Sequence, residues 1–268
     1  MEEIECLILK DRKKIPSHSF NIKNFIQKFS DNPWYIDKYN KDKKPKDIII
    51  NEIEKGERNC QIYKTLDNYM SLIKKRINEN EEETDEMIKI IKNFILRQIY
   101  KYITPKNLLK EDIQFYNKTL LLDWIQAENF EIKKSYVEQI SSAEMCIKNF
   151  DNAESIYDKL NYIKDAFTYI NNNIKYSTGK NEEAGQDEIL PIFQFILIKS
   201  NPKRIKTNIN YINCFLSEEE YDSQLGYFLS QIESSFTFIM KLGYKEVNLT
   251  QEEFDENIKK AKIRHSIA

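Results

Sequence analysis

Few residues of this sequence have the types and spacing that covalent catalysis or metal binding requires. The two histidines, His18 and His265, lie near opposite ends of the 268 residues, so a histidine-based triad or zinc site has little to draw on. The glycine-rich motifs of P-loop and dinucleotide-binding proteins and the Gly-x-Ser-x-Gly motif of hydrolases are absent from the sequence. We therefore expect no covalent chemistry, no metal and no cofactor.

The cysteines form no recognisable cluster either. Their spacing contains no Cys-x-x-Cys pair, which favours free buried thiols of a reducing compartment over a metal or disulfide role. Residues 1–5 are acidic and lack the basic and apolar regions of a signal peptide, and no apolar stretch is long enough to span a bilayer. We expect a cytoplasmic protein without a transmembrane segment. The four cysteines are Cys6, Cys60, Cys146 and Cys214.

Charge and composition narrow the fold and the partners. The chain has 41 basic and 43 acidic residues, and the two signs are interspersed. A nucleic-acid surface needs a clustered basic excess, so we expect no nucleic-acid partner. Hydrophobic residues make up 41% of the chain, with only five glycines and six prolines. A β-sandwich or Rossmann-like domain normally uses more turn glycine, so the composition predicts an all-α protein.

Two late segments, 187–199 and 227–242, carry residues that could contact a partner. On a helical wheel at about 100° per residue, each segment has a main apolar stripe and a second face with few charges. Such a second face is either buried against a further helix or kept for a partner protein, and burial is the commoner outcome. The second faces carry Asp187, Pro191, Gln194, Phe195 and Ile198 in the first segment, and Tyr227, Ser230, Gln231, Ser234 and Phe238 in the second.

Helical periodicity predicts the elements that position these faces. The first predicted domain, 1–103, is a bundle that includes a helical hairpin with a solvated turn at 78–83. Thr104 and Pro105 resemble an N-cap followed by proline at the first helical position, and so predict where the next domain begins. The helices predicted in the bundle cover 20–29, 46–53, 62–77 and 87–99.

The second predicted domain covers 104–247, and a C-terminal helix over 248–268 is expected to pack on the preceding domains. This last helix begins with a capping box at Thr250 and Glu253, flanked by a hydrophobic staple of Leu249 and Phe254. The helices predicted in the second domain cover 113–124, 136–150, 155–174, 187–199 and 217–242, with a loop at 175–186 and a possible break at Gly226.

The residues around these two faces resemble a known family. The run Gly185-Gln186-Asp187-Glu188-Ile189-Leu190-Pro191 is similar to the Gly-x-Asp-Asp/Glu-x-Leu-Pro signature of the vacuolar protein sorting 9 domain family. The resemblance covers roughly residues 95 to 245, so it is far more specific than one short motif. It continues through Leu122-Asp123-Trp124-Ile125, Lys159-Leu160, 197–202, 208–212, Gly226-Tyr227-Phe228-Leu229-Ser230 and Phe238-Ile239.

Members of that family are guanine nucleotide exchange factors for early-endosomal Rab GTPases of the Rab-five subfamily. They are layered α-helical proteins that bind the GTPase switch regions in a groove between two helices. The resemblance implies a Rab partner in its nucleotide-free and GDP forms, and peripheral association with early endosomes through other factors. A monomer is expected.

The resemblance also implies roles for individual residues. Asp187 matches the family's aspartate finger, and Tyr227 matches the tyrosine that supports exchange. A carboxylate directed at a GTPase's P-loop lysine and Mg²⁺ site would compete with the phosphates and speed GDP release without any covalent step. The implied partner-binding residues are Pro191, Phe195, Ile198, Ser230, Ser234 and Phe238, where Ser230 replaces the family's usual threonine.

Each role has a structural alternative. Asp187 lies where an N-cap aspartate would lie, and Tyr227 could be a buried aromatic whose hydroxyl bonds a loop. Asn208 fits a turn better than a partner contact. For the whole protein, the alternatives are a noncatalytic helical scaffold that keeps the fold without exchange activity, or an adaptor unrelated to GTPases.

Overall fold

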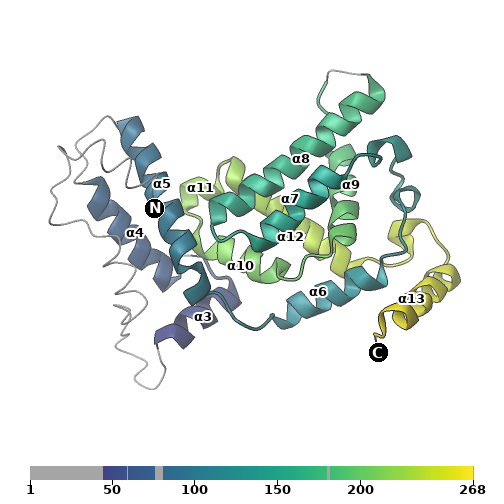
Figure 1. The fold of residues 1–268 in the computed structure, drawn as a ribbon, viewed down its shortest axis with the longest axis horizontal. Helices are drawn as coiled ribbons and strands as arrows, with labels where there is room; N and C mark the ends of the chain where they lie inside the picture. The colour runs from purple at the N-terminus through teal and green to yellow at the C-terminus, as the bar shows by residue number, and fades with distance from the viewer. Residues whose placement is uncertain (1–44, 59, 76–80, 180–181, 268) are drawn as a thin grey trace. The chain divides into compact units, whose positions relative to one another are not determined.

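The computed structural model describes residues 45–58, 60–75, 81–179 and 182–267 (Figure 1). Within these ranges every regular element is a helix and none is a strand, which confirms the all-α prediction. The helix predicted over 20–29, together with His18 and Cys6, lies outside the described residues. The chain divides into two compact units, and each unit is built from more than one stretch of sequence.

Among the described residues, the first unit contains those up to Pro105 and two short segments from later in the sequence, Glu154–Ile156 and Asn210–Phe215. Both α3 and α4 pack against α5. Both helices of the predicted hairpin bury apolar side chains, including Ile62 and Ile95 at 0% exposure. Its helices are α3 (Pro45–Lys55), α4 (Gln61–Lys74) and α5 (Glu81–Ile103), so α5 already begins inside the turn predicted at 78–83.

The later segments belong to the first unit because their side chains complete its core. Tyr211 is fully buried, and its ring meets Tyr100 edge-on at 5.1 Å between centroids. Its hydroxyl donates a hydrogen bond of 3.1 Å to the carbonyl of Glu154. Cys60 and Cys214 are both buried free thiols, and Sγ of Cys60 donates to the carbonyl of Cys214 at 3.5 Å. The domain limits predicted from the sequence did not include these segments in the first unit.

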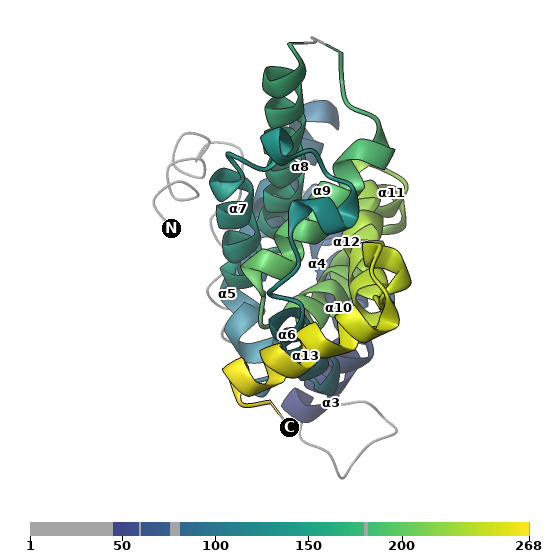
Figure 2. The same cartoon turned by 90° about the vertical axis from the view of Figure 1, so that its right-hand side faces the viewer.

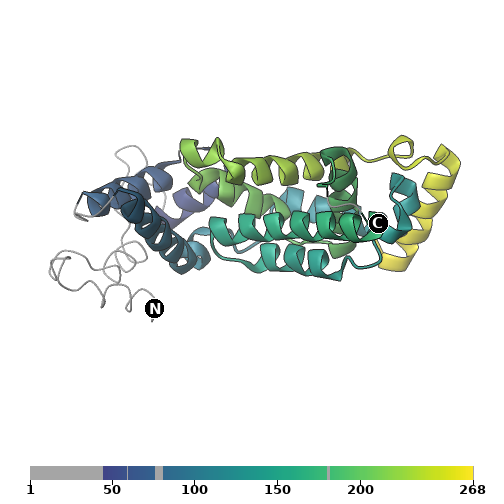
Figure 3. The same cartoon turned by 90° about the horizontal axis from the view of Figure 1, so that it is seen from above.

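The second unit is built around α9. This helix packs against α6, α7, η1 and α12, while α13 crosses α6 (Figure 2). Seen from above, α8 and α12 lie in separate layers (Figure 3). The elements are α6 (Lys110–Leu121), η1 (Ala127–Phe130), η2 (Lys134–Tyr136), α7 (Ser141–Asn152), α8 (Ile156–Thr178), α9 (Gln186–Ser200), α10 (Ile205–Phe215), α11 (Glu218–Tyr221), α12 (Gln224–Lys241), η3 (Lys245–Val247) and α13 (Gln251–His265). The first residue of α8 and residues 210–215 of α10 belong to the first unit.

Two predicted helix boundaries are wrong. Thr104 does not begin a helix: its hydroxyl donates to the carbonyl of Tyr100 at 2.7 Å, so it follows the end of α5. The break predicted at Gly226 lies earlier, because Ser223 is the N-cap of α12 and accepts from the amide of Leu225 at 3.2 Å. Gly226 is instead a point of close approach, since a β-carbon there would lie 1.7 Å from the carbonyl oxygen of Tyr221.

The last helix begins as its sequence predicts. The amide of Glu253 donates to Oγ1 of Thr250 at 3.3 Å, and the carboxylate of Glu253 accepts from the amide of Thr250 at 3.0 Å. This reciprocal pair is the predicted capping box, which satisfies two amides that have no partner within the helix. Phe254, which lies in the first turn of α13, is buried.

Candidate partner-binding groove

Asp187 is an exposed residue in the first turn of α9. The N-cap of this helix is Gly185, whose extended backbone has φ −66° and ψ 158°. The carbonyl of Gly185 accepts from the amides of Glu188 and Ile189, each at 3.1 Å. The N-cap alternative for Asp187 is therefore wrong, because that position belongs to Gly185. The acidic side chain still lies at the positive end of the helix dipole, where a carboxylate is favourable.

The segment that carries Asp187 is tied to helices on two sides. The amide of Ala184 donates to Oδ1 of Asn171 on α8 at 2.9 Å. Nε2 of Gln186 donates to Oε1 of Gln231 on α12, also at 2.9 Å. The carboxylate of Asp187 lies over Gly185, since a β-carbon on that glycine would be 2.3 Å from Oδ1 of Asp187. The start of α9 is thus held to both α8 and α12.

The other predicted residues of α9 lie deeper. Pro191 is half-buried in the second turn of α9. Because proline has no N–H, the carbonyl of Asp187 cannot accept the usual helical hydrogen bond from this position. Phe195 and Ile198 are only 5% and 2% exposed. Neither presents appreciable surface to a partner in this conformation, as the burial alternative predicted for this helix face.

Tyr227 lies on the surface at the start of α12, with 42% of its area exposed. Its ring approaches that of Phe167 on α8 at 6.4 Å and that of Phe228 at 5.2 Å, both edge-on. The buried-tyrosine alternative therefore does not hold. The aromatic contacts fix the ring against α8 while leaving part of it accessible to a partner.

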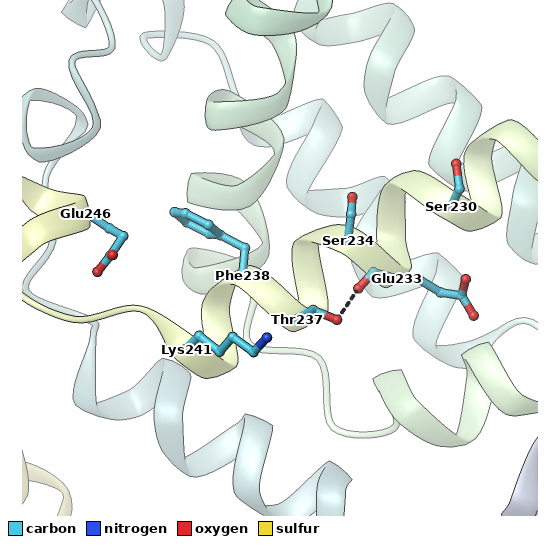
Figure 4. Close-up of a pocket in the computed structure, with 7 residues that line it drawn as sticks. All are labelled: Ser230, Glu233, Ser234, Thr237, Phe238, Lys241 and Glu246. Atoms are coloured by element: carbon cyan, nitrogen blue, oxygen red, sulfur yellow. Dashed lines mark hydrogen bonds between the residues drawn. The ribbon is translucent and has the colours of Figure 1, made fainter.

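Ser230, Ser234 and Phe238 line a single groove on α12, with a volume of about 700 Å³ (Figure 4). Ser230 and Ser234 donate their hydroxyls to α12 carbonyls, at 2.7 Å to Tyr227 and 2.9 Å to Gln231. Both hydroxyls therefore already have a hydrogen-bond partner within the helix. Because serine side chains are small, this wall of the groove lets a partner approach closely. The remaining lining residues are Glu233, Thr237, Lys241 and Glu246.

The aromatic floor and the charged rim give this groove a mixed character. The ring of Phe238 is half-buried, and its centroid lies 6.1 Å from that of Phe130 in η1. Two carboxylates and one ammonium surround it, so no single sign of charge dominates the lining. An apolar centre with a polar rim is the arrangement that protein partners usually bury.

Two polar residues of the family-like stretches are buried and hydrogen-bonded within the second unit. Lys159 is fully buried and donates to the carbonyl of Phe150 at 3.1 Å. Asn208 is also fully buried, and its amide donates to Oδ1 of Asp151 at 3.1 Å. It lies inside α10 and not in a turn, so the predicted turn is wrong, although its contact is within the fold. The pair of Gln186 and Gln231 was missed by sequence reasoning, because nothing local links residues 45 positions apart.

Nothing in the described ranges indicates a metal centre or a membrane span. No group of three or more His, Cys, Asp or Glu side chains there could hold a metal ion. Across the same residues, every helix is too short or too polar to pass through a bilayer.

Comparison with known proteins finds a family whose model matches the stretch that carries the groove helices. Residues 140–244 match the model of the vacuolar sorting protein 9 (VPS9) domain, which includes both α9 and α12. The chain is 26% identical over 194 residues to vacuolar protein sorting-associated protein 9A of Arabidopsis thaliana, covering 70% of this chain and 37% of that protein.

Two further relatives are similar to this chain over somewhat shorter stretches. The chain is 29% identical over 184 residues to the Rab5 GDP/GTP exchange factor of Bos taurus, covering 65% of this chain and 37% of the relative. It is 30% identical over 159 residues to vacuolar protein sorting-associated protein vps901 of Schizosaccharomyces pombe, covering 57% and 27%. The chain therefore spans well under half the length of these relatives.

Proposed function

Starting from the VPS9 domain that residues 140–244 carry, we propose that this protein is a guanine nucleotide exchange factor for a Rab GTPase of the Rab5 kind. It accelerates GDP release and is not an enzyme of covalent chemistry. Its partner is the nucleotide-free or GDP form of the GTPase. Its place of action is the cytoplasmic side of early endosomes, to which other factors recruit it peripherally.

The observation that carries this proposal is an exposed acid beside an open groove. Asp187 is exposed at the start of α9, and the bond from Gln186 to Gln231 ties that start to α12. On α12, exposed Tyr227 is followed at helical spacing by Ser230, Ser234 and Phe238. A partner bound along this face would therefore meet an apolar groove and a carboxylate together.

The chemistry follows from how a GTPase holds its nucleotide. A P-loop lysine, backbone amides and Mg²⁺ bind the phosphates of the nucleotide, which in GDP end at the β-phosphate. The carboxylate of Asp187 offers that lysine an alternative anionic partner. Its negative charge also repels the phosphates and disturbs the Mg²⁺ coordination. Both effects favour the nucleotide-free state, and the groove contacts stabilise that state on the exchange factor.

The proposed partner surface is limited to the side chains that the fold leaves accessible. It comprises Asp187, the half-buried Pro191, and the α12 residues Tyr227, Ser230, Ser234 and Phe238. Phe195 and Ile198 act from beneath, by packing α9 against its neighbours.

The test is release of fluorescent GDP from a panel of purified Rab proteins. Asp187→Ala and Asp187→Asn should each slow release by about 30-fold to 1,000-fold, because a charge-assisted contact in a desolvated interface contributes about 2–4 kcal/mol. Since Gly185 occupies the N-cap, either variant should lose less than about 1 kcal/mol of stability. Glu188→Gln, which neutralises the adjacent exposed carboxylate, is the matched control and should keep most of the activity.

The outcomes separate the proposal from its alternatives. A fully active Asp187→Asn protein would rule out the aspartate mechanism. A wild-type protein that binds nucleotide-free Rab without speeding GDP release would instead be a noncatalytic scaffold. Failure to bind any Rab would favour an adaptor unrelated to GTPases.

A further inference from the structure

We propose that Gln186 and Gln231 are positioning residues that act through Asp187, by fixing the first turn of α9 against α12. This inference rests on the exchange function proposed above and assigns the hydrogen bond between the two side chains a role in its rate. The two residues are not expected to contact the nucleotide.

The geometry of the pair makes it an anchor rather than a surface contact. Gln231 is only 7% exposed, whereas Gln186 is exposed at the first position of α9. Nε2 of Gln186 lies 2.9 Å from Oε1 of Gln231. A hydrogen bond to a largely buried acceptor is costly to leave unmade, so this bond holds better than one between two solvated amides.

The first turn of α9 depends on such anchors because it projects from the core. Residues 186–188 are exposed, and continuous burial begins only at Ile192. Before Asp187, the chain is held by the bond from Ala184 to Asn171 and then by the bond from Gln186 to Gln231. Asp187 therefore follows directly after the second of two anchors that come from different helices.

The hydrogen bond between Gln186 and Gln231 also sets the position of Asp187 relative to the groove. Gln231 comes one helical turn after Tyr227 and directly after Ser230, so it lies among the exposed groove residues while facing inward. Fixing Gln186 to Gln231 therefore fixes the height of Asp187 along α12. Misplacement of a reacting group by about 1 Å can cost up to about 100-fold in rate, so one flexible turn is enough to matter.

The experiment combines Gln186→Ala with Asp187→Ala. Gln186→Ala should lower the maximal rate of GDP release roughly tenfold, with little change in the concentration of Rab needed for half-maximal rate. In the Asp187→Ala background it should cause no further loss, because a positioning residue acts through the group that it places. Gln186→Glu keeps the length of the side chain, but its carboxylate has no N–H to donate to Oε1 of Gln231, so it should lose rate as Gln186→Ala does. Gln224→Ala, an exposed glutamine at the start of α12, is the matched control.

A second readout does not depend on exchange activity. Hydrogen–deuterium exchange of the amides of residues 188–190 should be faster in Gln186→Ala than in the wild type, and unchanged in Gln224→Ala. Unaltered protection, an unchanged rate in Gln186→Ala, or an equal loss of rate with and without Asp187 would each overturn the positioning role. A wild-type protein inactive on every Rab would instead overturn the proposed function, while the amide protection would still report on the anchor.

Discussion

Arg264 binds the carboxylate of Asp123 through two hydrogen bonds of 2.9 and 2.8 Å, although 141 residues separate them in the sequence. Nε2 of His265 lies 2.8 Å from Oδ2 of the same carboxylate. Beside Asp123, the ring of Trp124 meets that of Phe254 edge-on at 5.7 Å. A polar clamp near the end of α13 and an aromatic contact near its start therefore attach this helix to the region just after α6.

Truncation after Asn248 should lower the melting temperature by several degrees. It removes buried Phe254 and Ala261, exposes the Trp124 ring and leaves Asp123 without its partners. Loss of a buried aromatic side chain typically costs about 3–5 kcal/mol of stability. The cost here should be smaller, because α13 lies at the surface and water can reach the space that it leaves. Thermal unfolding of the full chain and the truncated chain measures the difference. An unchanged melt would show that α13 contributes nothing to the fold.

The same clamp predicts a pH dependence. Burial opposes ionisation of Asp123, but the hydrogen bonds and charges of His265 and Arg264 outweigh it and hold its pKa below the usual range. A carboxyl with a lowered folded pKa contributes stability above its unfolded pKa, near about 4, and loses it as the pH falls through the folded value. The melting temperature of the wild type should exceed that of Asp123→Asn at pH 7 and pH 5, and the gap should close below about pH 4. A gap that widened in acid would contradict this assignment.

For helix α9, the sequence predicted the bounds of the helix but not which of its faces is buried. Its apolar run and the following Asn201 and Pro202 predicted a helix over 187–199, and the structure has Gln186–Ser200. Which of its faces is buried could not be predicted in the same way. A helical wheel assumes one inward side, whereas neighbours on several sides bury every residue from Ile192 to Ile198.

Much of what the sequence did not predict involves polar residues whose hydrogen-bond partners are distant in the sequence. The helix α10 (Ile205–Phe215) was not predicted, because its asparagines resemble a turn and break the apolar pattern. Two of them are buried in the structure with hydrogen-bond partners, Asn208 with Asp151 and Asn210 with the carbonyl of Glu54. The bond from Gln186 to Gln231 was hidden for the same reason, since the fold alone brings these residues together.

The groove on α12 predicts an asymmetry between two neighbouring positions. Phe238 is the half-buried aromatic of the groove, whereas Thr237 lies on its exposed edge and donates its hydroxyl to the carbonyl of Glu233 at 2.9 Å. Aromatic residues at the centre of an interface commonly contribute about 2 kcal/mol or more to binding. Phe238→Ala should therefore weaken binding to the nucleotide-free GTPase by about 30-fold, and Thr237→Ala by less than about threefold. Titration calorimetry gives both values, and equal effects would place the partner elsewhere.

Gly185→Ala offers a way to move the Asp187 carboxylate without removing its charge. The backbone of Gly185 has φ −66° and ψ 158°, which any residue can adopt, so the substitution adds no backbone strain. The new β-carbon would lie 2.3 Å from Oδ1 of Asp187, so the carboxylate must swing away.

The clash involves only the tip of a flexible side chain, but alanine is a poorer N-cap than glycine, so the stability loss of Gly185→Ala should be about 1 kcal/mol. GDP release should nevertheless slow severalfold, and adding Gly185→Ala to Asp187→Ala should cause no loss beyond that of Asp187→Ala alone. Gly243→Ala is the control, since its β-carbon would make only an ordinary contact of 3.5 Å with Glu246. Full activity in Gly185→Ala would mean that the carboxylate acts from a conformation other than the one lying over Gly185.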